Sequence, residues 1–150
     1  AVAWPGTYMT QTLAGVSRER LIELPVAEEM QAGMANGLAL AGFIPVSIYP
    51  RFNFMLLAVN QIVNHLDKLP LISRYEPKVI IRVGIGTTRP IHPQAQHVGD
   101  FTKAFQLMCR TLEIIRLDDE RDIMPAYDRA LHREDGRSTM LVEYGDRYQP

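Results

Sequence analysis

One residue whose type and position could support acid–base chemistry is a glutamate. Glu28 follows Pro25 at the start of a helix-compatible stretch, so its carboxylate falls in the first helical turn. The helix dipole favours the anion there and would by itself lower the pKa of such a carboxyl group. Burial against Phe52 or Phe54 would raise that pKa instead. The alternative for Glu28, and the expectation for its neighbour Glu29, is a solvated acid at a helix start.

Two phenylalanines and a histidine are the other candidates. Phe52 and Phe54 are alternate residues near the end of an expected strand, where aromatic side chains commonly belong to the core. His97 stands beside Gln96 in a polar loop and is by default a surface histidine. Its distance along the chain from His92 makes the two a poor metal pair, so no metal ligand is assigned.

Composition and missing motifs argue against several classes of function. The net charge is −1, which argues against nucleic acid as a main partner. The longest apolar run, Phe54 to Val59, is too short to span a bilayer, so no membrane partner is expected. Gly84-Ile85-Gly86 lacks the third glycine of a dinucleotide-binding loop, and neither zinc-ligand spacing nor a Gly-x-Ser-x-Gly element is present. The single Cys109 cannot form an internal disulfide, which favours a reducing, cytoplasmic location.

Strands and helices alternate along the chain and must position the candidate side chains. Strands are expected at 21–24, 45–50, 78–85, 113–117 and 139–144, and helices at 26–41, 53–68, 101–109 and from the acids at 118–120 toward Gly136. An irregular arm is expected at 1–15 and a connection at 69–77. This alternation predicts an α/β fold, a mostly parallel sheet with helices on both faces, as a single domain over residues 1–150. Ligands of such sheets bind at the carboxyl ends of the strands, which here are the loops at 24–29, 49–54 and 85–97.

A few residues predict how the helices end and pack. Pro25 fits the first position of its helix and Gly42 the residue after its end. Asp100 is the expected N-cap of the helix at 101–109. Gly33 and Gly37 share one helix face, and each costs about 0.5–1 kcal/mol relative to alanine. The pair therefore indicates that something packs very close to this face.

The glutamate helix resembles a helix of a known family. Pro25, Glu28, Gly33, Gly37 and Ala41-Gly42 match, without a gap, the glutamate-bearing helix of the pyrimidine-binding domain in transketolase-like thiamine diphosphate enzymes. The closest look-alikes are the beta subunits of 2-oxo acid dehydrogenase first components. Further motifs follow in the family's order: Pro45, Phe52-Asn53-Phe54, Gln61 and Gln96-His97. The arm, with Gly6-Thr7-Tyr8, also fits, so the resemblance covers nearly the whole chain.

The resemblance implies a role for each candidate residue. Glu28 would hydrogen-bond the aminopyrimidine ring nitrogen of thiamine diphosphate and favour the imino tautomer, for which its carboxylate must be partly desolvated. Phe54 would stack on the pyrimidine ring with Phe52 beside it, although Phe52 fits core packing equally well. His97 would lie on the substrate side, where it would orient a carbonyl or move a proton.

The resemblance also implies that this chain supplies half of an active site. In the family another domain holds the diphosphate and its Mg²⁺ through a Gly-Asp-Gly element, whereas here Gly145-Asp146 is followed by Arg147. The expected partner is a diphosphate-binding subunit or domain that brings the Mg²⁺, in a hetero-oligomer or a dimer of dimers. The glycines of the Glu28 helix would pack against such a partner. The first strand and the C-terminal domain of relatives are expected to be missing.

The implied activity is that of a thiamine diphosphate-dependent enzyme that cleaves or transfers carbon units next to a carbonyl. It would be of the 2-oxo acid dehydrogenase or transketolase type, with a small-molecule substrate that the sequence leaves open. The alternative is a non-catalytic α/β interaction module derived from such a domain. A third possibility is a doubly wound small-molecule-binding domain unrelated to thiamine. The retained Glu28 favours the enzyme.

Overall fold

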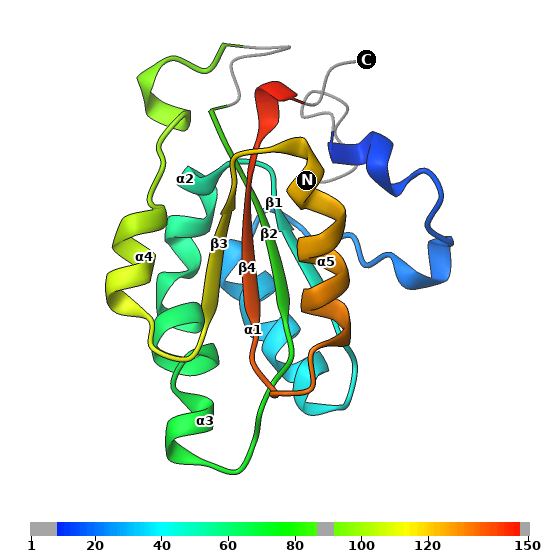
Figure 1. The fold of residues 1–150 in the computed structure, drawn as a ribbon, viewed down its shortest axis with the longest axis vertical. Helices are drawn as coiled ribbons and strands as arrows, with labels where there is room; N and C mark the ends of the chain where they lie inside the picture. Colours follow the sequence, from blue (N-terminus) through cyan, green and yellow to red (C-terminus); the bar gives the residue numbers. More distant parts are fainter. Residues whose placement is uncertain (1–8, 87–91, 148–150) are drawn as a thin grey trace.

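Four parallel strands form the centre of the molecule in a computed structural model, which describes residues 9–86 and 92–147. They are β1 (Val46–Tyr49), β2 (Ile80–Ile85), β3 (Glu113–Leu117) and β4 (Thr139–Tyr144), in the order β1-β2-β4-β3. Every neighbouring pair is parallel, so the carboxyl ends share one edge of the sheet, at the top of Figure 1. The predicted parallel α/β fold is confirmed.

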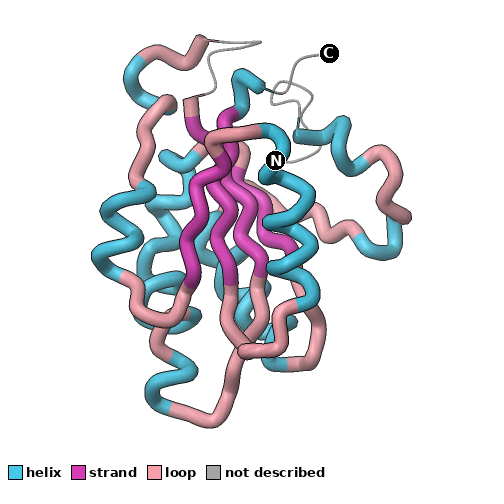
Figure 2. The backbone as a smooth tube through the Cα atoms, in the orientation of Figure 1, coloured by secondary structure: helices cyan, strands magenta, loops and turns pink. Residues whose placement is uncertain are grey.

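Helices and short helical turns connect these strands, as Figure 2 shows. The α-helices are α1 (Glu28–Leu40), α2 (Phe52–Met55), α3 (Leu69–Ile72), α4 (Thr102–Met108) and α5 (Ile123–His132). The other helical turns are η2 (Met9–Leu13), η3 (Arg18–Arg20), η4 (Leu56–Ala58), η5 (Asn60–Leu66), η6 (Ala95–His97), η7 (Glu120–Asp122) and η8 (Gly145–Arg147). In the described part of the chain, no helix is both long and apolar enough to cross a bilayer.

The two inner strands send alternate side chains to opposite faces of the sheet. Ile81 of β2 and Met140 of β4 belong to the main core, which also contains side chains of α1, α2, η5 and α4. Ile80 and Leu141 lie on the other face, in a smaller cluster with Ala130 of α5. Figure 1 shows α5 in front of the sheet and α1 behind it. Helices therefore cover both faces, as predicted, and the β-branched run of β2 is completely buried.

Helix α1 ends as its sequence predicts. Gly42 has a φ of +90°, which favours glycine because a side chain is strained there. The Gly42 N–H donates to the Ala39 carbonyl at 3.0 Å, and the Phe43 N–H donates to the Leu38 carbonyl at 3.0 Å. These two bonds form a Schellman motif, which satisfies carbonyls at the end of the helix.

Two predictions before α1 are wrong. The segment expected as a strand at 21–24 is not in the sheet; η3 precedes it, and Leu21 and Ile22 are 40% and 59% exposed. A strand needs a hydrogen-bonded neighbour, and this segment runs away from the sheet, on the right of Figure 1. Pro25 is not the first helical residue, because the N-cap is Ala27 and α1 begins at Glu28.

The helix expected at 53–68 forms as α2, η4 and η5 in succession, with a π-type turn in which the Asp67 N–H donates to the Ile62 carbonyl at 2.9 Å. The expected connection after it contains the short α3, which begins with a proline in its first turn. Asp100 acts at the start of α4 as predicted: its carboxylate accepts from the Thr102 N–H at 2.9 Å, although the formal N-cap is Phe101. Arm residues 1–8 and loop residues 87–91 lie outside the described residues.

Candidate functional site

Glu28 is the first residue of α1, and this end of the helix lies beside the carboxyl end of β1. The link is Gln31, whose Nε2 donates to Ser47 Oγ at 3.0 Å and to the Ile48 carbonyl at 2.9 Å. Glu28 is half-buried, as predicted, whereas Glu29 is exposed. Within the described residues the Glu28 carboxylate has no hydrogen bond or ion pair. It is therefore an available acceptor at the sheet edge where ligands bind in parallel folds.

Tyr49, the last residue of β1, is a site residue that the sequence reasoning missed. Its side chain is 1% exposed, and its hydroxyl has no hydrogen-bond partner among the described residues. Burial raises the pKa of Tyr49 to about 12; the nearby Ser47 hydroxyl acts against this rise, and the charge of Glu28 adds to it. The signal available in the sequence was a tyrosine at the carboxyl end of a strand, where a polar atom has a ligand within reach.

Phe54 and His97 meet near the same end of β1. Their ring centroids are 5.1 Å apart and their planes are inclined by 44°. Both side chains are half-buried. His97 is therefore not a fully exposed surface histidine, which is the alternative that its polar loop suggests. The Nδ1 atom of His97 is buried and has no partner in the described part of the chain. The structure thus brings together the two residues that the family resemblance places around one ligand.

The segment that carries His97 is held in place from the turn after β1. Arg51 Nη1 donates to the His97 carbonyl at 3.3 Å, and the Gly99 N–H donates to Asn53 Oδ1 at 3.0 Å. Arg51 is buried, which lowers the pKa of its guanidinium, while the charge of Asp146 acts in the opposite direction. Sequence reasoning did not single out Arg51, because a lone arginine after a strand carries no pattern.

Phe52 is a core residue, which corrects its assignment as a cofactor contact. Its side chain is 0% exposed. Its ring meets Phe101 edge-on at 5.6 Å and Phe105 at 5.3 Å between centroids. Residues 52 and 54 point to different surroundings because they lie in the first turn of α2 rather than in an extended strand. For Phe52 the structure therefore supports core packing rather than a cofactor contact. Phe54 remains the candidate for stacking against the ring of a ligand.

The glycine face of α1 is only partly covered in this chain. A Cβ atom built at Gly33 would meet Gln61 side-chain atoms at 3.7 Å, an ordinary contact, and one built at Gly37 would meet nothing within 4 Å. The neighbouring Met30 and Met34 are 43% and 38% exposed. Nothing in the described chain thus requires glycine at these positions, so close packing against this face stays a prediction about a partner.

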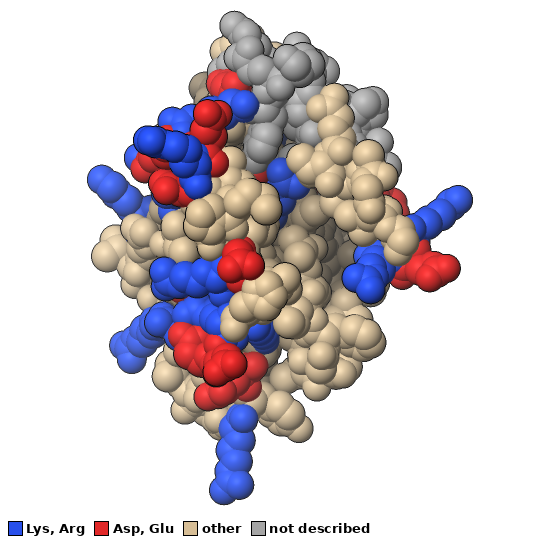
Figure 3. Space-filling model, turned by 45° about the vertical axis from the view of Figure 1, so that its right-hand side comes forward, with Lys and Arg blue, Asp and Glu red and all other residues tan. Residues whose placement is uncertain are grey.

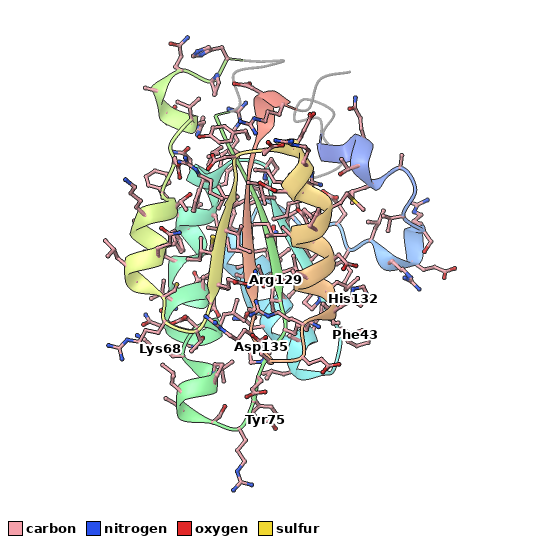
Figure 4. All side chains as sticks on the ribbon, viewed as in Figure 1. Phe43, Lys68, Tyr75, Arg129, His132 and Asp135 are labelled. Atoms are coloured by element: carbon pink, nitrogen blue, oxygen red, sulfur yellow. The ribbon has the colours of Figure 1, made fainter. Side chains whose placement is uncertain are left out.

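Other features of the molecule lie away from this group of residues. A cavity of about 140 Å³ near the ends of β3 and β4 is lined by Leu117, Asp119, Glu120, Ile123, Glu143, Tyr144 and Arg147. Among the described residues, no group of three or more His, Cys, Asp or Glu side chains could hold a metal ion. On the face in Figure 3, basic and acidic side chains alternate rather than forming a patch of one sign. Figure 4 places Lys68, Tyr75, His132 and Asp135 toward the opposite end of the molecule from the carboxyl ends of the strands.

Comparison with known proteins gives this group of residues a family context. The model of the transketolase pyrimidine-binding domain matches residues 2–148. The mitochondrial pyruvate dehydrogenase E1 component subunit beta of Caenorhabditis elegans is 31% identical over 99 residues, which cover 65% of this chain and 27% of the relative. The 3-methyl-2-oxobutanoate dehydrogenase subunit beta of Mycobacterium tuberculosis is 32% identical over 97 residues, 65% of this chain and 28% of the relative.

A third relative is the pyruvate dehydrogenase E1 component subunit beta of Cyanidium caldarium, which is 35% identical over 89 residues, 58% of this chain and 27% of the relative. The matches span little more than a quarter of the length of these relatives. The family model, in contrast, covers almost every residue of this chain and includes Glu28, Phe54 and His97. On that match, the chain belongs to the family of transketolase pyrimidine-binding domains.

Proposed function

We propose that this chain is the pyrimidine-binding half of a thiamine diphosphate-dependent enzyme that cleaves or transfers a carbon unit next to a carbonyl. One observation carries the proposal: the half-buried Glu28 carboxylate is unpaired within the described residues and lies at the carboxyl end of a parallel strand. Membership of the family supports the same assignment, as does the similarity to beta subunits of 2-oxo acid dehydrogenases. A 2-oxo acid is therefore the proposed substrate class.

The residues around Glu28 fit the pyrimidine half of this cofactor. An aminopyrimidine is a flat ring with polar atoms on its edge, so its site needs an aromatic surface and hydrogen-bonding groups without partners. Phe54 supplies the aromatic surface, and the Tyr49 hydroxyl and His97 Nδ1 are buried polar atoms without a described partner. Buried polar atoms are normally satisfied in proteins, so unsatisfied ones at one sheet edge point to a ligand.

Each residue then has a distinct task. Thiamine diphosphate, when bound, supplies the carbon nucleophile of the reaction. The Glu28 carboxylate holds a proton shared with the pyrimidine ring nitrogen, and partial burial strengthens this interaction because little water competes for it. Phe54 packs against the pyrimidine ring. His97, fixed through its backbone by Arg51, orients the substrate carbonyl or transfers a proton to it.

The proposed site needs a second subunit or domain. The described residues contain no group suited to Mg²⁺, which in this proposal reaches the site with the diphosphate-binding partner. The partly covered glycine face of α1 is the proposed contact surface, in a hetero-oligomer or a dimer of dimers. A relative of this type is named as a subunit beta, which supports a multisubunit assembly.

The test is Glu28→Gln in the assembled enzyme, supplied with thiamine diphosphate and Mg²⁺. The substitution keeps the size of the side chain but removes the carboxylate that shares the proton. We expect turnover of a 2-oxo acid to fall at least about 100-fold, because positioned proton transfer contributes about 10²–10⁴-fold. Glu29→Gln is the matched control, since Glu29 occupies the same helical turn but is exposed. It should behave as wild type.

Two results would contradict the proposal. Near-normal turnover of Glu28→Gln would remove Glu28 from the chemistry. A wild-type assembly that binds its partner but ignores thiamine diphosphate would identify the chain as the non-catalytic interaction module instead. Native mass spectrometry of the assembly with and without cofactor distinguishes this second outcome directly.

A further inference from the structure

Tyr49 carries a buried polar atom to which the proposed mechanism has so far given no particular contact. Its hydroxyl is buried and has no partner in the part of the chain that the structure describes. The neighbouring polar side chain on the same face of β1, Ser47, accepts a hydrogen bond from Gln31, and its hydroxyl lies near enough to lower the pKa of Tyr49 without making a hydrogen bond of normal geometry to it. A buried hydroxyl without a partner costs free energy, so its presence in the core needs an explanation.

The hydroxyl lies close to the first turn of α1. Gln31 of α1 donates to Ser47 Oγ on the Tyr49 face of β1, Glu28 lies one turn before Gln31 on the same side of α1, and the Glu28 charge adds to the raised pKa of Tyr49. With a pKa of about 12, Tyr49 keeps its proton at neutral pH and is a hydrogen-bond donor. The nearby Glu28 carboxylate has no partner among the described residues. A hydrogen-bond donor and an acceptor of complementary type therefore lie in the same part of the site without being bonded to each other.

We propose that Tyr49 is a positioning residue of this site: its hydroxyl donates to one oxygen of the Glu28 carboxylate when the pyrimidine is bound. The other carboxylate oxygen then faces the ring nitrogen. This inference rests on the proposed function, since it assigns a second contact to the same glutamate. In the bound state the hydrogen bond holds the Glu28 side chain in one rotamer, so that its other oxygen stays directed at the ring nitrogen.

The substitution Tyr49→Phe tests this directly because it removes the hydroxyl and leaves the ring in the core. In the assembled enzyme without cofactor, we expect thermal stability to be unchanged or higher, because an unsatisfied buried group is removed. We expect the Kd for thiamine diphosphate, measured by titration calorimetry with Mg²⁺ present, to rise about fivefold, the loss of one hydrogen bond. The near-ultraviolet circular dichroism of the bound aminopyrimidine should weaken or shift, because Glu28 no longer holds one orientation.

A double-mutant comparison shows whether Tyr49 acts through Glu28. In a Glu28→Gln background, adding Tyr49→Phe should change the Kd much less than fivefold, because the charged acceptor is already gone. Tyr144→Phe is the matched control: Tyr144 is also the last residue of a parallel strand at the same sheet edge, and it lies on β4, separated from β1 by β2. It should leave the Kd and the spectrum unchanged.

The outcomes separate the two proposals. If Glu28→Gln binds cofactor and turns over normally, the proposed function fails. If Glu28→Gln is impaired while Tyr49→Phe matches wild type in Kd and spectrum, the role of Tyr49 is overturned and the proposed function stands. Equal effects of Tyr49→Phe in both backgrounds would also overturn it, because Tyr49 would then act independently of Glu28.

Discussion

The imidazole of His97 packs against the ring of Phe54, with 5.1 Å between the ring centroids. The two residues come from segments on either side of β2, and hydrogen bonds from the turn after β1 hold them together. One of these bonds is made by Arg51 and the other by Asn53, so both neighbours of Phe52 fasten the His97 segment. The aromatic pair is therefore joined by hydrogen bonds to the residues that follow β1.

Phe54 and Phe52 should respond differently to substitution by alanine. Phe52→Ala should destabilise the fold by about 3–5 kcal/mol, because its fully buried ring packs between Phe101 and Phe105. Phe54→Ala should cost much less stability but weaken thiamine diphosphate binding up to about tenfold, the value of an aromatic contact. Urea unfolding and cofactor titration measure the two quantities. Equal loss of stability in both variants would show that Phe54 is also core.

A buried ion pair lies on the α5 side of the sheet and leads to a second prediction, which concerns the stability of the fold. Arg82 Nη2 lies 3.0 Å from Glu143 Oε2, and their side chains are 9% and 2% exposed. The Tyr127 hydroxyl donates to Glu143, and Arg82 Nη1 donates to Thr12 Oγ1 at 2.6 Å. Burial, followed by the charge of Glu143, raises the pKa of Tyr127, which keeps this hydroxyl a donor. The network ties β2, β4, α5 and the N-terminal arm together.

Removing one partner of this ion pair should lower the free energy of unfolding more than removing both partners. Arg82→Met leaves the Glu143 charge buried without its partner, for which we expect a loss of about 3–5 kcal/mol in the free energy of unfolding. Arg82→Met combined with Glu143→Leu should recover at least half of that loss, because no uncompensated charge remains. Urea denaturation of the single and double variants tests this. Strictly additive losses would mean that the two side chains contribute independently.

The fold was predictable because its signals are local. The β-branched run of β2, Gly42 after α1 and the alternation of strands with helices each report one property of the backbone, and the structure confirms them. The expected strand at 21–24 failed because a strand also depends on a neighbour that the segment itself does not encode. The apolar residues there are the same types found in real strands, so composition could not distinguish the two cases.

The site was predictable in part, for a different reason. The ordered motifs of a family singled out Glu28, Phe54 and His97. Such motifs give the place of a residue along the chain but not what its side chain touches. Which of the two phenylalanines faces the core depends on the helical turn at α2, and the sequence alone left both alternatives open. Tyr49 and Arg51 belong to no motif. They join the candidate site because the Tyr49 hydroxyl is buried without a partner among the described residues and Arg51 bonds the His97 carbonyl, which only the folded chain shows.

Two glycines, Gly37 inside α1 and Gly42 just after it, should respond in opposite ways to substitution by alanine, because their backbone conformations differ. Gly42 has a φ of +90°, so Gly42→Ala should destabilise this chain by about 1–2 kcal/mol. Gly37 lies inside the helix with open space around it, so Gly37→Ala should stabilise the isolated chain by about 0.5–1 kcal/mol through helix propensity. If the proposed partner packs on this face, the same Gly37→Ala change should weaken assembly, because a methyl group then separates the two surfaces. Thermal unfolding of the chain and native mass spectrometry of the assembly measure the two effects, and a Gly37→Ala variant that assembles as well as wild type would place the partner elsewhere.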